Sequence, residues 1–316
     1  MLNFLVTGGA GFIGSHLINK LISEQGNFIF CLDNFDEFYN PEIKRKNISS
    51  FLNKNNFRLV EGDIRDRTTV ESIFKKNKID VVVHLAARAG VRPSLKLPAL
   101  YFDVNVNGTI NILEVMREHN CTKMVFASSS SVYGNNTKIP FSEDDNVDYP
   151  ISPYAASKKA GELVCHTFNH LYGFDITCLR FFTVYGPGQR PEMAIHQFAK
   201  NIMDGKPINV FGDGSTKRDY TFIDDIIQGV IASINNLGGY HIYNLGESKT
   251  IELIELIKLI EKYIGKKAIL NYLPEQPGDV KLTFSDVTKA RKELGYNPVT
   301  SMDEGIKKFV DWLRKN

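Results

Sequence analysis

The sequence predicts an α/β protein in which a doubly wound parallel sheet is accompanied by a second, smaller α/β domain. Up to Arg180, short apolar runs alternate with helical patterns, which is typical of βαβ units. After Arg180 the alternation loosens, because Pro187, Gly188 and Pro191 interrupt it. We expect strands at Leu2–Thr7, Phe28–Asp33, Phe57–Glu61, Asp80–His84, Lys123–Ala127 and Asp175–Leu179, with helices near 67–77, 98–119 and 153–172.

The chain is expected to divide into two domains, since 316 residues exceed the usual size of one. We place the sheet domain at residues 1–182 and the smaller domain at 183–316, with 224–246 returning to the first domain. The elements expected in this part are helices near 193–204 and 224–236, a strand at Tyr240–Asn244 that rejoins the main sheet, a helix at Ile251–Ile264, a small strand at Lys266–Tyr272 and a turn at Gln276–Asp279.

The composition is that of an ordinary globular protein. Hydrophobic residues make up 43% and charged residues 23%, and the net charge of +2 favours no nucleic-acid partner. The four cysteines are far apart without a C-x-x-C spacing, so we expect neither disulfides nor a metal site. No leader and no apolar run of membrane-spanning length is recognisable, so a cytoplasmic protein is expected. The basic runs 44–46 and 75–76 are interpreted as solvated helix faces.

A glycine-rich turn directly follows the first apolar run. Gly9, Gly11 and Gly14 satisfy G-x-G-x-x-G between a strand and a helical pattern, the context that a dinucleotide-binding turn requires. These glycines permit a tight turn and a close approach of backbone to a pyrophosphate. Asp33 ends the second run nineteen residues later, where a carboxylate binds a ribose diol and repels a 2′-phosphate. We therefore expect a Rossmann-type sheet that binds NAD, with Asp63 near the adenine edge.

A tyrosine and a lysine lie four residues apart in the helix predicted at 153–172. Tyr154 and Lys158 then share one face of the helix, one turn apart. A free phenol titrates near pH ~10, and an ammonium group close to it favours the phenolate and lowers its pKa. Such a pair is a suitable acid/base device for an alcohol beside a dinucleotide.

Several motifs together resemble those of a known family, the extended short-chain dehydrogenase/reductases, and within it the nucleotide-sugar epimerases and dehydratases. The resemblance covers nearly the whole chain. The motifs that carry it are Thr7–Gly14, His84–Ala87, Asn105–Thr109, Ser128–Gly134, Tyr154 with Lys158, and Arg180–Pro187.

This resemblance implies roles for the residues. Tyr154 would be the acid/base, Lys158 would lower its pKa and hold the nicotinamide ribose, and Ser129 would hydrogen-bond the reacting hydroxyl. His84 is interpreted as a structural hydrogen-bond partner. The helices at 98–119 and 153–172 would form a four-helix bundle in a homodimer. The implied NAD-binding residues are Gly8, Gly11, Phe12, Ile13, Gly14, Asp33, Asn34, Asp63, Ile64, Leu85, Ala86, Ala87 and Asn105, with Tyr154 and Lys158.

The residues after Ser129 bear on the reaction. Dehydratases of the group have an acidic pair there, and decarboxylases have a glutamate at the second position. This chain has Ser130 and Ser131 instead. Without a second acid/base, the 4-keto sugar formed by oxidation is expected to take its hydride back on the other face. The expected reaction is C4 epimerisation of a UDP-sugar with tightly bound NAD.

The segments 180–194 and 86–92 are most similar to those of UDP-glucuronate 4-epimerases, which favours UDP-glucuronate as the substrate. A sugar carboxylate requires donors, and a guanidinium offers a bidentate fork. Arg190, or less favourably Arg88 or Arg92, would supply it, with Thr183 adding a hydroxyl.

The same resemblance implies a site for the uridine diphosphate. Arg218 would neutralise the pyrophosphate, Val210 and its neighbours would flank the uracil, and Asp279 would bind the uridine ribose. Two alternatives stay open: a 4-epimerase of UDP-glucose or UDP-N-acetylglucosamine, and a non-catalytic NAD-binding regulatory protein. An activated phenol has no purpose in the second, which counts against it.

Overall fold

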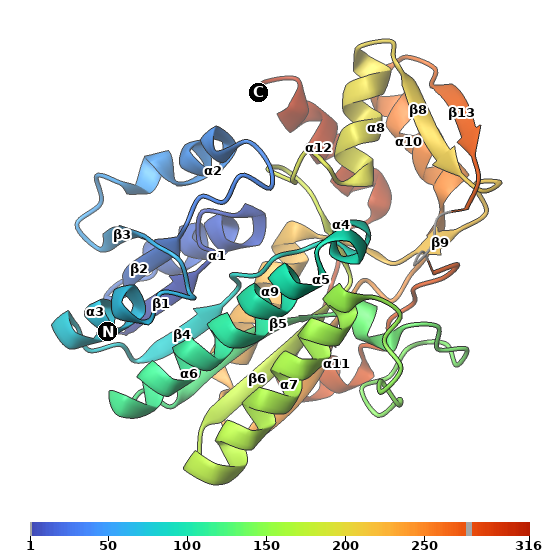
Figure 1. Ribbon diagram of the computed structural model, residues 1–316. Coiled ribbons are helices and arrows are strands. Elements are labelled where there is room, and N and C mark those ends of the chain that lie inside the picture. Colours follow the sequence, from blue (N-terminus) through green and yellow to red (C-terminus); the bar gives the residue numbers. More distant parts are fainter. Residues whose placement is uncertain (1, 276–279) are drawn as a thin grey trace.

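A parallel sheet forms the centre of the computed structural model, which describes residues 2–275 and 280–316 (Figure 1). Within these residues the sheet has seven strands in the order β11-β6-β5-β4-β1-β2-β3. The predicted doubly wound α/β class is confirmed. The strands are β1 (Asn3–Thr7), β2 (Phe28–Asp33), β3 (Phe57–Glu61), β4 (Val81–His84), β5 (Lys123–Ser129), β6 (Asp175–Phe181) and β11 (Tyr240–Leu245).

The central strands are buried on both faces, which explains why they read as nearly continuous apolar runs. Leu5, Val82 and Val125 have no solvent exposure. Thr7 at the end of β1 is in register with Leu32 and His84 on the neighbouring strands. The carboxyl ends of β1, β2 and β4 therefore meet at one edge, where ligands bind in sheets of this kind.

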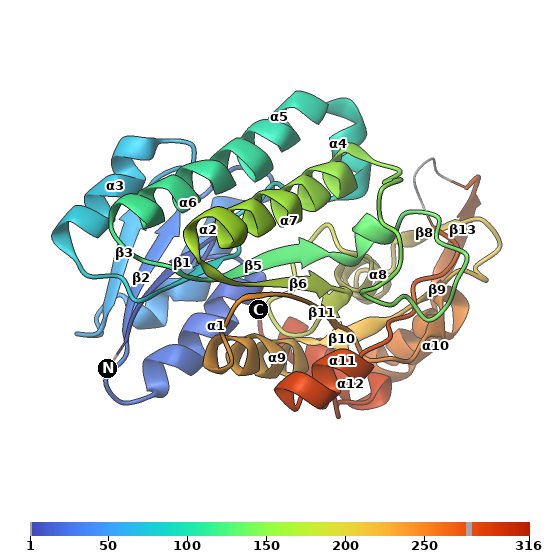
Figure 2. The same ribbon diagram turned by 90° about the horizontal axis from the view of Figure 1, so that it is seen from below.

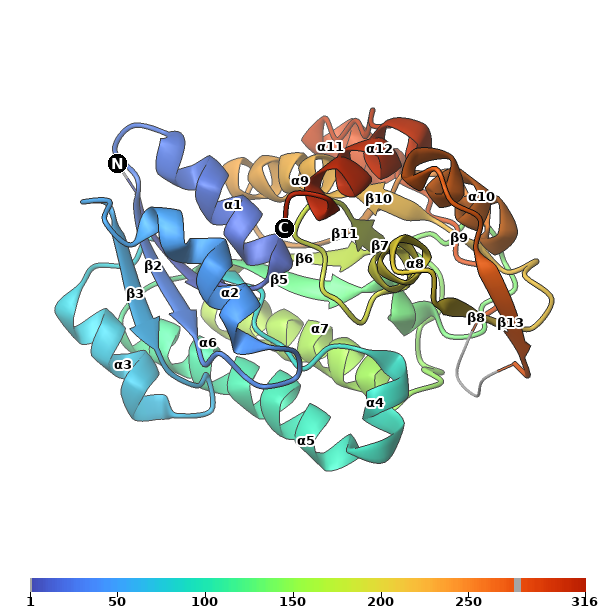
Figure 3. The same ribbon diagram turned by 90° about the horizontal axis from the view of Figure 1, so that it is seen from above.

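Helices cover both faces of the sheet (Figures 2 and 3). Local signals set their ends: the Ser152 side chain caps the longest helix by accepting from the Ala155 N–H, and Gly173 ends it at φ +67°. One layer contains α3 (Arg67–Lys76), α4 (Val91–Lys96), α5 (Pro98–Phe102), α6 (Gly108–Glu118) and α7 (Pro153–Tyr172). The opposite layer contains α1 (Phe12–Ser23), α9 (Ile223–Asn235) and α11 (Thr288–Leu294), with α2 (Pro41–Ile48) beside α1.

A smaller lobe lies beyond the carboxyl ends of β5 and β6 (Figure 2). Among the residues that the structure describes, three short strand pairs and three helices build it, and its apolar side chains join the core on the α1 side of the sheet. Its elements are β7 (Thr183–Tyr185) with β10 (Tyr220–Phe222), β8 (Pro207–Phe211) with β13 (Ile269–Leu273), β9 (Lys217–Arg218) with β12 (Ile251–Glu252), and the helices α8 (Ala194–Met203), α10 (Leu253–Ile264) and α12 (Met302–Leu313).

The strand predicted at 240–244 does return to the main sheet, as β11 beside β6. The helix predicted at 98–119 is divided, because a π-helical segment, Asp103–Asn107, separates α5 from α6. The strand predicted at 266–272 begins later, at Ile269. The predicted turn at 276–279 lies outside the described residues. In the described part of the chain, no helix combines the length and apolar character needed to cross a membrane.

Candidate active site

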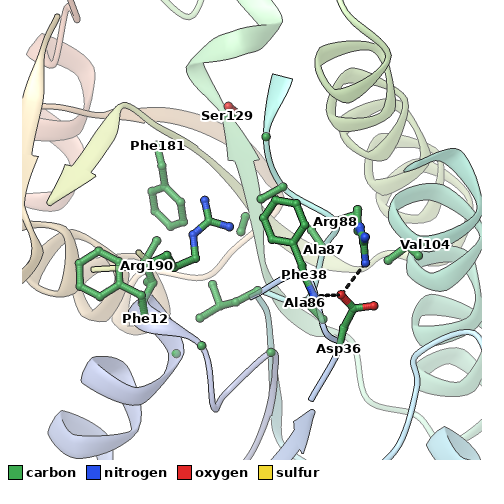
Figure 4. Close-up of a pocket in the computed structure, with 18 of the residues that line it drawn as sticks. Phe12, Asp36, Phe38, Ala86, Ala87, Arg88, Val104, Ser129, Phe181 and Arg190 are labelled. Atoms are coloured by element: carbon green, nitrogen blue, oxygen red, sulfur yellow. Dashed lines mark hydrogen bonds and ion pairs between the residues drawn. The ribbon is translucent and has the colours of Figure 1, made fainter. Parts of the chain in front are cut away.

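One cavity of about 470 Å³ runs along the carboxyl ends of the strands. It extends from the glycine turn to the first loop of the smaller lobe, and Figure 4 shows part of its lining. This volume falls in the usual range for small-molecule sites. The predicted residues that line it are Gly8, Gly11, Phe12, Ile13, Gly14, Asp33, Asn34, Asp63, Ile64, Leu85, Ala86, Ala87, Arg88, Ser129, Tyr154, Lys158, Thr183 and Arg190.

The glycine turn has the close packing that its sequence predicts. Gly8 has a φ of +68°, and a Cβ on it would lie 2.7 Å from the Ala86 nitrogen. A Cβ on Gly14 would lie 2.4 Å from the Gly8 oxygen. The N-terminus of α1 begins at Gly11 without a side-chain cap. Its free N–H groups line the cavity, where they can bind an anion such as a pyrophosphate.

Asp33 and Asp63 lie at the adenosine end expected from the sequence. The Asp33 carboxylate accepts hydrogen bonds from the backbone of Ala10 and Phe35, at 3.0 and 2.9 Å. Burial raises the pKa of Asp33, and the two N–H donors oppose that shift. Arg65 lowers the pKa of Asp63 to about 2 by donating to its carboxylate. Both groups are held by the backbone or by a neighbouring cation, so their orientation is fixed before any ligand binds.

Lys44 is a cavity residue that the sequence interpretation assigned wrongly. The basic run predicts a solvated helix face, but Lys44 is only 7% exposed and lines the cavity near Asp33. Its Nζ donates to the Asp36 carbonyl at 2.8 Å. Arg45 and Lys46 are exposed, as expected. The signal was present, because Lys44 is one turn before the buried Ile48 and therefore on the same face of α2.

Ser129, Tyr154 and Lys158 come together at the other end of the cavity. Ser129 ends β5, and its Oγ accepts from the Ser131 N–H at 3.2 Å. The Lys158 Nζ donates to the Ala127 carbonyl at 2.6 Å. All three predicted catalytic residues line the same wall. A hydroxyl bound there would have one phenol, one alcohol and one amine as neighbours.

The ionisation of the pair differs from the sequence prediction. Burial lowers the pKa of Lys158 to about 8. Burial also raises the pKa of Tyr154, while hydrogen bonding with Ser129 and the charge of Arg190 act in the opposite direction. Arg190 is the cation whose charge opposes the rise in the pKa of Tyr154 in this geometry. Desolvation disfavours both the ammonium and the phenolate, and the effect predicted for Lys158 on the phenol stays a prediction.

His84 has the structural role expected for it. Its two ring nitrogens face the hydroxyls of Thr7 and Thr109, at 2.7 and 3.0 Å. Burial lowers the pKa of His84 to about 3, so the ring is neutral. Thr7 in turn accepts from the Ala86 N–H. The ring thereby links β1, β4 and α6 beneath the cavity.

Asn105 supports the cavity wall and is absent from the lining. It lies in the π-helical segment and is 2% exposed. Its amide accepts from the Arg88 N–H at 2.7 Å and donates to the Arg88 carbonyl and the Ser157 hydroxyl. The prediction that Asn105 contacts the cofactor is therefore corrected: its side chain is fully engaged with protein partners.

The three arginines proposed for a sugar carboxylate lie in different surroundings. Arg190 lines the cavity together with Thr183, and its Nε is 3.2 Å from a Glu192 oxygen. Arg88 pairs with Asp36 at 2.5 Å. Arg92 is absent from the cavity lining and stacks on Phe211, with 4.3 Å between the guanidinium carbon and the ring centre. Arg190 remains the candidate with access to a ligand.

A second cavity of about 160 Å³ adjoins the first and shares Val91, Ser130, Ser131 and Thr183 with it. Arg218 lines it, as expected for a diphosphate ligand. Val210 is completely buried in the core, so its side chain is not available to a ligand, and flanking of a uracil by this segment stays a prediction. Asp279 lies outside the described residues.

A buried carboxylate holds this second cavity together. Asp219 has no exposure and accepts from the Ser285 N–H and hydroxyl and from the Glu247 N–H. Its own carbonyl accepts from the Thr183 N–H. Asp219 therefore connects β7, the segment after β11 and the segment before α11 directly beside Arg218. No motif identified it in the sequence.

The comparisons with known proteins agree with this geometry. The family described as GDP-mannose 4,6 dehydratase matches residues 5–309. The chain belongs to the extended short-chain dehydrogenase/reductases. The predicted family resemblance is confirmed.

Other members of the extended short-chain dehydrogenases are similar over almost the whole chain. A UDP-glucuronate 4-epimerase of Thermodesulfobacterium geofontis is 45% identical over 314 residues, covering 99% of this chain and 96% of that protein. The structure of a UDP-glucuronic acid 4-epimerase from Bacillus cereus with UDP-glucuronic acid and NAD is 36% identical, with a TM-score of 0.94 and 99% of each chain covered. A Thermotoga maritima UDP-glucose 4-epimerase with UDP-glucose is 34% identical, with a TM-score of 0.92 and again 99% of each chain covered.

The lining limits which reactions this extended short-chain dehydrogenase can support. In the described residues, the carboxylates of the two cavities are Asp33, Asp36 and Asp63, all away from Ser129. Ser130 and Ser131 occupy the positions where an eliminating enzyme of the family would carry acids. The described lining thus places Tyr154 and Lys158, and no carboxylate of either cavity, with Ser129.

Proposed function

We propose that this protein is an NAD-dependent UDP-sugar 4-epimerase that interconverts UDP-glucuronate and UDP-galacturonate. The observation that carries the proposal is the continuous cavity. It joins the glycine turn and Asp33 at one end to Ser129, Tyr154 and Lys158, with Thr183 and Arg190 beside them. A dinucleotide and a sugar bound in this cavity would meet at Tyr154.

The residues that line the cavity are suited to binding NAD. The glycine turn and the open N-terminus of α1 would hold its pyrophosphate, and Asp33 and Lys44 would hold the adenosine ribose. When bound, NAD supplies the oxidation and the later reduction at C4. The carboxylate at position 33 would exclude the extra phosphate of NADP.

The residues of the chain move the proton. In its phenolate form, which the charge of Arg190 and a nearby cationic nicotinamide would favour, Tyr154 takes the proton of the C4 hydroxyl. It returns the proton when the alcohol is restored on the other face. Ser129 hydrogen-bonds the same oxygen and keeps it aligned. The ammonium form of Lys158 orients the nicotinamide ribose, and its pKa of about 8 allows that form at neutral pH. With Ser130 and Ser131 as the next residues, no second acid/base removes a C5 proton, so the sugar is epimerised and not dehydrated.

Arg190 and Thr183 are proposed to bind the carboxylate of the sugar. A 4-keto glucuronate is a β-keto acid, which loses CO2 when its C–C bond aligns with the ketone π system. A guanidinium fork can hold the carboxylate away from that alignment. Arg190 would exchange its contact with Glu192 for the ligand, whereas Arg88 is already committed to Asp36.

One observation favours a second candidate, a 4-epimerase of neutral UDP-hexoses. Glu192 already forms an ion pair with Arg190 and balances its charge, so the site does not require an anionic sugar. The similar Thermotoga maritima protein is named a UDP-glucose 4-epimerase. The relatives named UDP-glucuronate 4-epimerase support the first candidate.

A panel of UDP-sugars tests the proposal. Purified protein without added cofactor is incubated with UDP-glucuronate, UDP-glucose and UDP-N-acetylglucosamine, and the products are identified by chromatography and NMR. We expect UDP-galacturonate to form fastest. Preferred conversion of UDP-glucose would support the second candidate. No conversion of any sugar, even with added NAD, would favour a non-catalytic NAD-binding protein.

We also infer a homodimer, a cytoplasmic location and a division into two domains, residues 1–182 with 224–246 returning to them, and the rest of 183–316. α6 and α7 lie side by side on one layer (Figure 2), and α7 exposes Leu163, Leu171 and Tyr172. Leu163 and Leu171 are 54% and 64% exposed. Exposed apolar side chains on α7, with α6 beside it, are suited to a bundle with the same helix pair of a second copy.

A further inference from the structure

The segment 34–40, which connects β2 to α2 and is here called the strap, forms one wall of the main cavity. Asn34, Asp36, Phe38 and Tyr39 all line it. The strap starts directly after Asp33, and Phe35 adopts a φ of +50° with its N–H bound to that carboxylate. The strap therefore extends from the adenosine end of the cavity along the path that a bound dinucleotide would occupy.

Phe38 lies between two arginines that belong to other parts of the chain (Figure 4). The guanidinium carbon of Arg88 is 5.0 Å from the ring centre, and that of Arg190 is 5.9 Å away. These distances are within the range of cation–π attraction. Arg88 comes from the loop after β4 and Arg190 from the loop after β7. The ring thus joins the sheet domain and the smaller lobe across the cavity.

An ion pair reinforces this contact. The Asp36 Oδ1 accepts from the Arg88 Nη1 at 2.5 Å and from the Phe38 N–H at 2.8 Å. The Arg88 side chain is only 18% exposed, so solvent screens the pair incompletely. Lys44 adds a further anchor by donating to the Asp36 carbonyl. Asp36 therefore holds the backbone of Phe38 directly and holds its ring through Arg88.

The two arginines are carried by firmly held loops. Asn105 binds both backbone groups of Arg88. The loop before Arg190 is tied to α1 through His16, which contacts the Pro187 carbonyl at 2.9 Å. The strap itself exposes Asn34, Glu37 and Asn40 to solvent. It is consequently the part of this wall that is easiest to displace.

We propose that the strap is a latch that retains NAD, with Phe38 clasped between Arg88 and Arg190 and locked by the Asp36–Arg88 ion pair. This inference rests on the proposed function, because an epimerase returns its hydride to the same sugar and benefits from keeping its cofactor. Arg88 is then a positioning residue of the cofactor cleft, and its guanidinium is unavailable to the sugar.

The test measures cofactor release. Purified protein is loaded with NAD labelled in the adenine ring, chased with excess unlabelled NAD in the absence of sugar, and assayed for retained label over time. The variants are Phe38→Leu, which keeps apolar bulk but removes the π face, and Arg88→Gln. Glu37→Ala, an exposed neighbour on the strap, is the matched control. Melting temperatures are recorded in parallel.

We expect both variants to release label about tenfold faster than the wild type, with unchanged melting temperatures and with Glu37→Ala behaving as the wild type. If the two substitutions acted independently, the double variant would increase the release rate by the product of the two single-variant factors. We expect a smaller increase, because both substitutions act on one latch. Wild-type retention in both single variants would overturn the proposal, as would equally fast release from Glu37→Ala. Loss of label from the wild type during gel filtration would also overturn it.

Failure of the proposed function gives a different result. The chase contains no sugar, so faster release from the variants supports the latch even if no sugar is epimerised. Conversely, an active epimerase whose Phe38→Leu and Arg88→Gln variants retain NAD keeps the proposed function and loses the latch.

Discussion

Tyr154 is the side chain on which the proposed proton transfer depends. Replacing it with phenylalanine removes the hydroxyl and leaves the ring's contacts in place. We expect Tyr154→Phe to lower kcat for UDP-glucuronate by about 10²–10⁴-fold, while NAD stays bound. Product formation and the NAD content of the purified variant are measured together. Activity at the wild-type level in this variant would disprove the role given to the phenol.

Arg190 separates the two candidate sugars. A charged hydrogen bond is worth about 1.5–3 kcal/mol, so Arg190→Ala should lower kcat/KM for UDP-glucuronate by about 10–100-fold. UDP-glucose lacks the carboxylate and should be affected far less. Arg190→Lys is the matched control, because it keeps the charge and loses the planar fork. Equal losses on both sugars would show that Arg190 does not bind the carboxylate.

His84 should make the protein sensitive to acid. Its pKa is about 3 in the folded protein, against 6.5 for an unperturbed imidazole. Below pH 6.5 the unfolded chain binds a proton that the folded chain excludes, so stability falls as the pH falls. The contribution is about 1.4 kcal/mol per pH unit.

Urea denaturation of wild type and His84→Gln between pH 6.5 and pH 5 measures this contribution. The variant should be less stable at pH 7, because it alters two buried hydrogen bonds, but its stability should decline less steeply with acid. Parallel declines in the two proteins would mean that His84 titrates normally in the fold.

At the scale of the elements, α7 is attached to the sheet by a buried ion pair. Glu162 accepts from Arg180 through both oxygens at 2.9 Å, and Ser128 donates to it as well. Both side chains of the pair are 1% exposed. Glu162→Gln leaves the Arg180 charge without its partner, so we expect a loss of about 3–5 kcal/mol in the free energy of unfolding.

Urea titrations at pH 7 test this loss. Lys159→Met is the control, because Lys159 lies 3.8 Å from the same carboxylate without being fully buried. It should cost less than about 1 kcal/mol. A comparable loss in both variants would mean that general damage to α7, and not the unpaired Arg180, explains the result.

Elements with local signals could be predicted from the sequence. The bounds of α7 follow from Ser152, Pro153 and Gly173, and β2 and β3 were predicted with the bounds observed. The π-helical segment was not predicted, because a single turn with i→i+5 hydrogen bonds leaves no distinct apolar pattern within a longer helix. α2 was anticipated only as a charged helical face, and its buried Lys44 was missed.

At the scale of the whole molecule, the exposed apolar face of α7 predicts an association. Leu163→Asp places a charge in the proposed interface, and we expect it to yield a monomer in light scattering at concentrations where the wild type is a dimer. Tyr149→Asp is the control, since Tyr149 is 82% exposed and belongs to the loop before α7, not to the helix itself. A monomeric wild type would contradict the inferred dimer.

The site as a whole could be predicted only where motifs mark it. The glycine turn, Asp33, Ser129, Tyr154 and Lys158 belong to recognisable patterns, and all of them line one cavity. Phe38 and Asp219 belong to none. Their importance comes from contacts with residues that are 50 or more positions away, such as Arg88 and Ser285. Such contacts exist only once the fold has formed.

The return of α9 and β11 to the main sheet has a consequence for engineering. A fragment that stops at residue 182 would leave the edge of β6 unpaired and remove the helix that packs beside α1. The smaller lobe is therefore not an appendage that can be exchanged in one cut. To transfer the sugar preference of a relative, two segments must be replaced, one between β6 and α9 and another after β11. The sheet itself stays unchanged.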